Sequence, residues 1–353
     1  MTDVKIIRVL DGGLFTTVQD AGRYGFQRYG VPVSGAMDRG ALRAANALVG
    51  NDQAAAVLEI TLLGPRLEFL APATIALTGA DLRPRVGEAA LPTWQSVTLQ
   101  AGTVLSFAGT EDGVRSYLAI AGGFDVPVIL GSRSTYTRSR LGGFDGRALK
   151  SGDMLRVVGT HPVADLVGVG LGGGILVPRQ VPPTLRPRYG HEHVLRVVLG
   201  PQHDRFTPAG VGTLLSAPYK VTPQSDRMGY RLQGPKIEHT AGPDIVSDGS
   251  PLGAVQVAGD GMPIVLMADR GTAGGYTKIA TVIGPDVSRL AQAGLGDEVR
   301  FEAVTVEAAH AIVRQHEEWL RQAGGAAPGP AAGGRARRAA AAVAAVARYL
   351  TRG

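Results

Sequence analysis

The sequence predicts a mainly β protein built from two related modules with a few short helices. Glycine and proline account for 50 and 22 of the 353 residues, and 44% of the residues are hydrophobic, a composition typical of short strands joined by turns. From Ala55 onward, apolar runs such as Val57–Gly64 and Val114–Gly123 follow one another without intervening helices. That arrangement favours a barrel or sandwich over a parallel sheet.

Three motifs recur in the same order in the two halves of the chain. The segment 19–26 (QDAGRYGF) is echoed by 224–230 (QSDRMGY): in each, a Gln is followed by an Arg, one residue, a Gly and an aromatic. Further on, IALTGAD (75–81) resembles IVLMAD (264–269), and LQAGTVLSF (99–107) resembles AGLGDEVRF (293–301). The repetition predicts two related β modules, with chance recurrence of glycine-rich turns as the alternative.

We expect four segments along the chain. They are a first β module (1–165), a Gly- and Pro-rich junction (166–188), a second β module (189–322) and a low-complexity basic tail (323–353). Within the first module, Lys5–Leu10 and Leu14–Val18 are expected to pair as a hairpin around Asp11-Gly12-Gly13. Helices are expected at Met37–Val49, with Ser34 or Gly35 near its N-cap, at Asp286–Gly294, and at Val306–Gln322 with Thr305 as N-cap.

Charge and cysteine content narrow the classes of function. The segment from Leu320 onward holds six arginines and no lysine or acid, so it accounts for the whole formal net charge of +6. The rest of the chain is formally neutral, and we therefore expect no nucleic-acid partner. The absence of cysteine excludes disulfides, thiolate catalysis and Cys metal sites. Without a signal-like start or an apolar run near the roughly 20 residues of a membrane helix, the predicted location is cytoplasmic, with no membrane partner.

The central feature of the second half is the stretch Pro263–Ile283 (PIVLMADRGTAGGYTKIATVI). Pro263–Ala268 reads as a buried strand and Lys278–Ile283 as its return partner, enclosing a turn whose glycines let a ligand approach the backbone. Strand alternation places Asp269 with Val265 and Met267, and Lys278 with Ala280 and Val282. Two charges that extend apolar rows indicate either a structural Asp269–Lys278 pair or a catalytic one.

A polar cluster beside this stretch predicts a small anionic or amide-bearing ligand. Arginine suits bidentate capture of a carboxylate, and Gln or Ser suits an amide. The predicted catalytic residues are Lys278 and Asp269, and the predicted substrate-binding residues are Arg23, Gln224, Ser225, Arg227, Tyr230, Arg270, Gly274, Gly275 and Tyr276.

Other motifs carry less chemistry. Gly168–Gly173 matches G-x-G-x-x-G but opens no helix, and Gly271–Lys278 lacks the helix that a Walker A loop requires. His191-Glu192-His193 lacks a third zinc ligand at a suitable spacing, so an exposed strand start is favoured and no metal site is predicted. Ser34 and Ser132 have no evident base, which favours capping and turn roles.

The chain resembles the family of the C-type subunit of 5-oxoprolinase, also called allophanate hydrolase subunit 2. The motifs that carry the resemblance cover about residues 5 to 310: GLFTTVQDAGRYGFQRYGVPVSGAMDRGALRAANALVGN, LEITLLGP, IALTGAD, GSRST, VTPQSDRMGYRLQGP, ADRGTAGGYTKIATVIGPD and LGDEVRF. The same module resembles part of the carboxyltransferase domain of urea carboxylase. The resemblance implies a fold of two cyclophilin-like β-barrel subdomains.

The resemblance also implies partners. Family members work with subunits A and B in the ATP-dependent opening of 5-oxoproline to glutamate, and urea carboxylase relatives transfer a carboxyl group from biotin to urea. The sequence contains no biotin-carboxylase region and no Met-Lys-Met attachment motif, so no biotin is expected on this chain. It also departs from the usual family turn DRQTTGGYPKIA, reading DRGTAGGYTKIA, with Gly271 and Thr277 in place of Gln and Pro.

The sequence therefore predicts a subunit of a 5-oxoprolinase that is inactive alone and uses ATP in the assembled complex. Arg227 or Arg23 would hold the substrate carboxylate, Lys278 or backbone amides would polarise the lactam oxygen, and Asp269 would orient Lys278 or move a proton. Two alternatives stay open. They are a carboxyltransferase subunit for a urea-like acceptor, and a non-enzymatic regulator that binds the B-type partner subunit.

Overall fold

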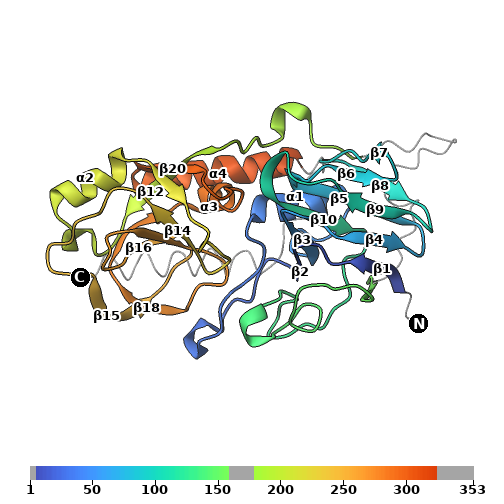
Figure 1. Ribbon diagram of the computed structural model, residues 1–353, viewed down its shortest axis with the longest axis horizontal. Coiled ribbons are helices and arrows are strands. Elements are labelled where there is room, and N and C mark those ends of the chain that lie inside the picture. The colour runs from blue at the N-terminus through green and yellow to red at the C-terminus, as the bar shows by residue number, and fades with distance from the viewer. Residues whose placement is uncertain (1–4, 159–178, 324–353) are drawn as a thin grey trace.

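The computed structural model describes residues 5–158 and 179–323, which form two β modules lying side by side (Figure 1). Most of the expected junction and nearly all of the basic tail lie outside the described residues. The strands of the first module are β1 (Lys5–Asp11), β2 (Phe15–Gln19), β3 (Val57–Thr61), β4 (Arg66–Phe69), β5 (Ala73–Asp81), β6 (Pro84–Val86), β7 (Ala89–Ala90), β8 (Ser96–Leu99), β9 (Val104–Phe107), β10 (Asp112–Ile120) and β11 (Met154–Arg156). Those of the second are β12 (Glu192–Leu199), β13 (Tyr219–Val221), β14 (Gly229–Gln233), β15 (Asp244–Gly249), β16 (Ala254–Val257), β17 (Pro263–Leu266), β18 (Ala273–Tyr276), β19 (Lys278–Val282) and β20 (Glu298–Ala303).

The first module packs two sheets around one apolar core. Their strand orders are β11-β1-β4-β9-β6-β7 and β2-β3-β10-β5-β8. Leu67 of β4 contributes to this core from one sheet, and Ile75 and Leu118 contribute from the other. The far side of β5 is also buried, because Ala76 packs with helix α1 (Arg39–Leu48). This second burial explains why β5 reads as a continuous apolar run rather than an alternating one.

The second module is a closed barrel of order β12-β19-β16-β17-β14-β13-β20. Strand alternation sends Val255, Val257 and Val265 inward to the core, while Gln256 and Ile264 face outward. The separate β15–β18 ribbon forms its own two-stranded sheet. The mainly β prediction is confirmed, and closure of this barrel removes the exposed strand edges that favour aggregation.

Three further helices complete the fold: α2 (Pro208–Ser216), α3 (Gly284–Leu290) and α4 (Val306–Ala323). The last helix passes beside both modules (Figure 1). Its Glu317 accepts two hydrogen bonds from Arg43 of α1, at 2.6 and 2.8 Å, and its Trp319 meets Trp94 of the first module edge to face. Thr305 caps α4 by accepting from the Ala308 amide at 3.2 Å, as expected. No helix among the described residues is long and apolar enough to cross a membrane.

Three local predictions are wrong. β1 and β2 enter different sheets instead of forming a hairpin. Gly12 allows the backbone to pack closely against Leu149, because a Cβ there would lie 2.1 Å from the Leu149 carbonyl oxygen. β17 and β19 do not pair either, since β16 lies between them. Helix α1 is capped by the Asp38 side chain, which accepts from the Ala41 amide at 3.0 Å, and not by Ser34 or Gly35.

Candidate functional site

A buried ionic network joins the two modules through Arg227. Its Nε donates to Asp269 Oδ2 at 2.9 Å, its Nη1 donates to Glu59 of β3, and its Nη2 donates to the Gly35 carbonyl oxygen at 2.7 Å. Burial opposes the charged form, but the two carboxylates outweigh it and raise the pKa of Arg227. The guanidinium that the sequence assigns to a substrate carboxylate thus has protein carboxylates as its partners.

A second buried network lies next to it. Arg115 Nη1 donates to the Tyr230 hydroxyl at 2.6 Å and to the Ala291 carbonyl oxygen, which ties β10 of the first module to the second. Gln292 Nε2 donates to Asp38 Oδ2 at 2.9 Å across the same boundary. Tyr230 is therefore held inside the interface, away from solvent.

Lys278 lies on the outer face of the barrel because of a β-bulge. The pairing of β16 with β19 shifts register between Val255 and Gln256, so that Gln256 stands opposite Lys278 instead of Ile279. Directly opposed residues share a face of the sheet, and Lys278 accordingly leaves the inward row of Ala280 and Val282 in which the alternation placed it. The expected Asp269–Lys278 pair is not formed.

The partner of Lys278 is Asp248 on β15. The Nζ lies 3.1 Å from Asp248 Oδ2, a close ion pair without the alignment of a good hydrogen bond. The Lys278 side chain is 2% exposed and that of Asp248 is 56% exposed. The contact with the Lys278 ammonium, followed by the hydrogen bond from the Gly249 amide, lowers the pKa of Asp248. The Lys278 ammonium therefore has Asp248 as its ion-pair partner and keeps N–H donors without an acceptor among the described residues.

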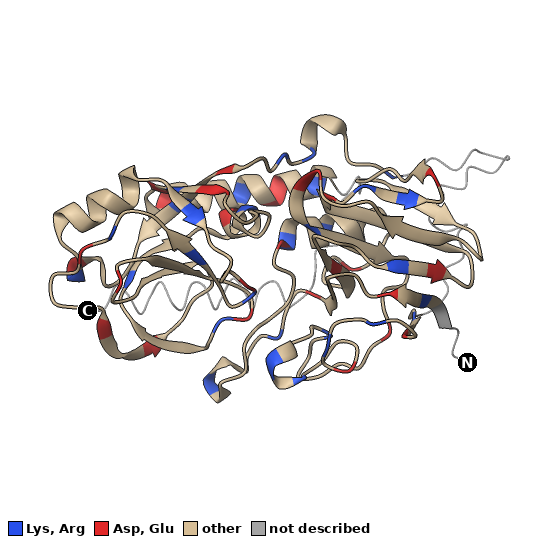
Figure 2. Cartoon of the chain, in the orientation of Figure 1, with Lys and Arg blue, Asp and Glu red and all other residues tan. Residues whose placement is uncertain are grey.

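A cavity of about 440 Å³ opens beside this pair on the outside of the barrel. Arg138 reaches it from a loop of the first module, where it lies 3.4 Å from Asp226, and Figure 2 shows basic residues on the loops beneath the two modules. The wall includes the backbone of the glycine-rich turn together with polar side chains of the barrel. Its lining residues are Arg138, Gln224, Asp226, Met228, Gly229, Arg231, Ser250, Gln256, Ile264, Leu266, Gly271, Ala273, Gly274, Gly275 and Tyr276.

Hydrogen-bond donors meet at Gly274 within this cavity. Gln256 is 6% exposed, and its Nε2 has no hydrogen-bond partner among the described residues. A Cβ on Gly274 would lie 2.7 Å from that nitrogen and 3.2 Å from Ser250 Oγ, so only glycine keeps the space open. A buried amide donor without an acceptor costs free energy that a bound oxygen would recover.

The predicted site residues fall into two groups. Gln224, Gly274, Gly275 and Tyr276 line the cavity, and Lys278 stands behind it opposite Gln256. Arg23, Ser225, Arg227, Tyr230, Asp269 and Arg270 do not line it. Ser225 Oγ bonds the backbone of Arg231 on both sides, donating at 3.2 Å and accepting at 3.1 Å.

The remaining two arginines are buried against carbonyl oxygens. Arg23 Nε donates to the Ile129 oxygen at 3.0 Å, and burial lowers the pKa of Arg23. Arg270 Nε donates to the Ser250 oxygen at 2.8 Å. Burial, followed by the positive charge of Arg39, lowers the pKa of Arg270 to about 10.

Comparison with known proteins places the chain in a family. The family model described as "Carboxyltransferase domain, subdomain A and B" matches residues 29–303. The chain belongs to this carboxyltransferase family. The C-type subunit of 5-oxoprolinase from Escherichia coli (strain K12) is 38% identical over 317 residues, covering 90% of this chain and 97% of that protein. The resemblance read from the sequence is thereby confirmed.

Larger proteins contain a similar part. Urea amidolyase of Saccharomyces cerevisiae is 31% identical over 327 residues, which are 89% of this chain but 17% of that protein. The solved structure of K. lactis urea amidolyase matches with a TM-score of 0.83 and 30% identity, over 92% of this chain and 20% of the other. The carboxyltransferase-family fold therefore occurs in a subunit-sized relative and in much longer chains.

Several residues of the cavity and of the networks beside it were missed from the sequence. Glu59 carried a readable signal, since a carboxylate within the apolar run VLEITLL requires a partner when that run is a buried strand. Gln256 and Arg138 carried none, because only the fold brings them to the glycine-rich turn. His193 was expected to be exposed but is buried, and its Nε2 lies 3.3 Å from Asp297. The described residues hold no group of three or more His, Cys, Asp or Glu arranged for a metal ion.

The cavity suits recognition of a small ligand with acceptor oxygens. It offers an amide N–H, a hydroxyl, exposed backbone and the Arg231 guanidinium. It does not fit a nucleoside triphosphate, because Gly271–Lys278 continues as strand β18 into β19 where a phosphate-binding loop would open a helix. What it can do is hold and polarise a carbonyl or carboxylate group.

Proposed function

We propose that this chain is a subunit of a 5-oxoprolinase that binds 5-oxoproline and acts with partner subunits A and B, the ATP being held by a partner. The observation that supports this most directly is the unpartnered Gln256 Nε2 inside a polar cavity, together with the relative named as a 5-oxoprolinase subunit. 5-Oxoproline presents two acceptors, a lactam oxygen and a carboxylate. The cavity presents matching donors in Gln256 and Arg231.

In this proposal Gln256 and Ser250 hold the lactam oxygen, and Lys278 adds positive charge behind them. Arg231 takes the carboxylate, in place of the Arg227 or Arg23 that the sequence favoured. It lines the cavity, and its side chain forms no hydrogen bond or ion pair among the described residues. Asp269 acts through Arg227 as part of the module boundary. Donors that point at a developing oxyanion in a dry site stabilise the transition state of amide opening.

The test is glutamate formation from 5-oxoproline by this chain with candidate subunits A and B, with and without ATP. We expect turnover only in the complete mixture. Arg231→Gln should raise KM by about 10- to 100-fold, which corresponds to loss of a charged hydrogen bond. Arg300→Gln is the matched control, because Arg300 is an exposed barrel arginine that pairs with Glu298 away from the cavity.

Gly274→Ala provides an independent check. Its methyl group would enter the space in front of Gln256 Nε2, so we expect loss of turnover while the complex still assembles. Unchanged KM in Arg231→Gln together with unchanged turnover in Gly274→Ala would contradict the assignment of this cavity.

A second candidate function is carboxyl transfer to a urea-like acceptor. The specific observation in its favour is the family model together with the K. lactis urea amidolyase structure. The same cavity would hold urea, which also presents a carbonyl oxygen to Gln256. Carboxylation of urea by a carrier that bears carboxybiotin, with no glutamate formed from 5-oxoproline, would favour this function over the first.

A further inference from the structure

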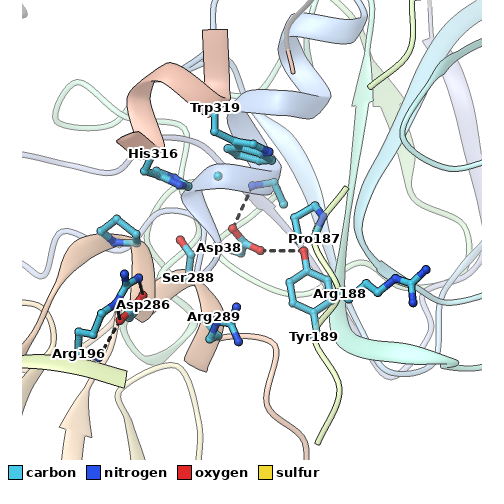
Figure 3. A pocket seen from close by; sticks show the side chains of 13 residues that line it. Asp38, Pro187, Arg188, Tyr189, Arg196, Asp286, Ser288, Arg289, His316 and Trp319 are labelled. Atoms are coloured by element: carbon cyan, nitrogen blue, oxygen red, sulfur yellow. Dashed lines mark hydrogen bonds and ion pairs between the residues drawn. The ribbon is translucent and has the colours of Figure 1, made fainter. Parts of the chain in front are cut away.

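A second cavity, of about 190 Å³, lies where the two modules and the last helix meet (Figure 3). It is separate from the glycine-rich turn and shares no lining residue with the first cavity. Its walls come from the start of α1, from α3, from α4 and from the segment that leads into β12. The lining residues are Asp38, Gly40, Ala41, Pro187, Arg188, Tyr189, Arg196, Pro285, Asp286, Ser288, Arg289, His316 and Trp319.

Asp38 places an uncompensated carboxylate in this cavity. It is 4% exposed and accepts hydrogen bonds from the Ala41 amide at 3.0 Å and Gln292 Nε2 at 2.9 Å, with the Tyr189 hydroxyl at 3.4 Å. No basic side chain among the described residues forms an ion pair with it. Burial raises the pKa of the Asp38 carboxyl. Carboxylate oxygens have capacity for further donors, so a bound cation would recover free energy here.

Two exposed arginine side chains line the same cavity. Arg188 and Arg289 are exposed, and neither forms an ion pair or a side-chain hydrogen bond within residues 5–158 and 179–323. Figure 3 labels Arg289 with Asp38 and Tyr189 among the side chains that line the cavity. Arg196 differs, since its Nε and Nη2 are bound to Asp286 at 2.8 and 2.5 Å. The cavity therefore has a negative end inside and free guanidinium groups at the opening.

A flat aromatic wall lines the same cavity (Figure 3). The rings of His316 and Trp319 stack with centroids 5.2 Å apart and planes 21° from parallel. The indole is fixed because its Nε1 donates to the Leu185 carbonyl oxygen at 2.7 Å. Gly40 leaves room for the imidazole, since a Cβ there would lie 3.3 Å from it. Such a wall accepts the carbon skeleton of a ligand.

We propose that this second cavity binds a free α-amino acid as a zwitterion. The ammonium group contacts Asp38, the carboxylate contacts Arg289 with Arg188 at the rim, and the side chain lies against Trp319. The ammonium and carboxylate of an α-amino acid share one carbon, so a buried acid and free guanidinium groups that line one small cavity match its charges. The volume is below the roughly 300 to 1,000 Å³ of sites for larger ligands. The site needs neither partner subunits nor the proposed function of the first cavity.

The test is calorimetric titration of the full chain alone with the common L-amino acids, beginning with glutamate and leucine. We expect at least one to bind with one-to-one stoichiometry. For that amino acid, the analogue lacking the amino group and the amine lacking the carboxylate should each bind at least about tenfold more weakly, the effect of losing one charged contact. If no amino acid binds at millimolar concentration, or if the deaminated analogue binds equally well, the proposal is overturned.

Two variants locate the binding. Asp38→Asn keeps an oxygen that can cap α1 but removes the charge. Arg289→Gln changes an exposed side chain, so this variant still tests the proposal if Asp38→Asn fails to fold. Each should weaken binding by about tenfold or more. Arg231→Gln in the first cavity should leave this binding unchanged. Unchanged affinity in Arg289→Gln would overturn the proposal, whereas loss of turnover in the assembled complex would bear only on the first cavity.

Discussion

Arg23 and Arg227 occupy corresponding places in the two halves of the chain but have different electrostatic surroundings. Each comes shortly after a Gln, and each is followed by a Gly and then an aromatic, at the same distance from the arginine in both halves. Both arginines are buried. Arg227 meets Asp269 and Glu59, whereas Arg23 donates only to carbonyl oxygens at 2.9 and 3.0 Å and leaves its Nη1 without an acceptor among the described residues. The same local motif therefore places a charge-paired arginine in one module and an arginine bound to backbone carbonyl oxygens in the other.

The difference arises from what each arginine joins. Arg227 lies at the boundary between modules, where β3 supplies Glu59 and the chain after β17 supplies Asp269. Arg23 stays within the first module and ties its own loop to the segment around Ile129 and Ser134. A buried ion pair contributes more to fixing how two parts of a protein are arranged than to the free energy of unfolding. That role suits a boundary between two separately packed cores.

Removal of Arg227 should have the largest effect on stability. Arg227→Met leaves Glu59 and Asp269 buried without their cation, and we expect a loss of about 3–5 kcal/mol in the free energy of unfolding. The measurement is urea denaturation of the variant and the wild type. A triple variant that adds Glu59→Gln and Asp269→Asn should recover part of the loss, because no buried charge is then uncompensated. A loss below about 1 kcal/mol for the single variant would contradict the role given to the network.

The corresponding change at Arg23 should cost less. Arg23→Met removes two hydrogen bonds to carbonyl oxygens but also a cation that is poorly satisfied, so we expect about 1–3 kcal/mol. The same denaturation series measures it. Equal losses in the free energy of unfolding for Arg23→Met and Arg227→Met would contradict the difference proposed between the two arginines.

Lys278 tests a third arrangement, a buried cation paired with an exposed acid. Lys278→Met leaves Asp248 in contact with water, so we expect a stability change within about 1 kcal/mol. In the assembled complex, the proposed function predicts a large fall in kcat with 5-oxoproline. Lys220→Met, a change at an exposed barrel lysine outside the cavity, is the control. Full activity in Lys278→Met would remove Lys278 from the reaction.

The smallest expected effect is on the pH dependence of stability, which should differ between the two modules. Residues 5–158 contain no histidine, whereas burial lowers the pKa of His193 in the second module. The unfolded chain, with a histidine pKa near ~6.5, takes up a proton at that position before the folded chain does. The wild type should therefore lose stability relative to His193→Gln as pH falls below ~6.5 and match its pH dependence above that value. Denaturation midpoints of the two proteins across this range are the measurement.

Much of the fold could be read from the sequence, because it depends on periodicity and turn chemistry. Helix α4 and its Thr305 cap follow from local pattern, as do β17 and β19 as separate strands. Pairing did not follow: β16 entered between β17 and β19, and Gly12 proved to be a contact point and not a hairpin turn. Pairing depends on which distant segment offers a matching edge, and sequence spacing does not encode that directly.

The sequence alone determined the family, the β class and the glycine-rich turn that lines the first cavity. Only the tertiary structure decided which charges meet. A bulge of one residue turned Lys278 outward to Asp248, and closure of the module boundary brought Glu59 to Arg227. The reason is physical: strand alternation fixes a side chain's face only while the register is unbroken, and an ion pair forms with whichever acid the packing brings within reach.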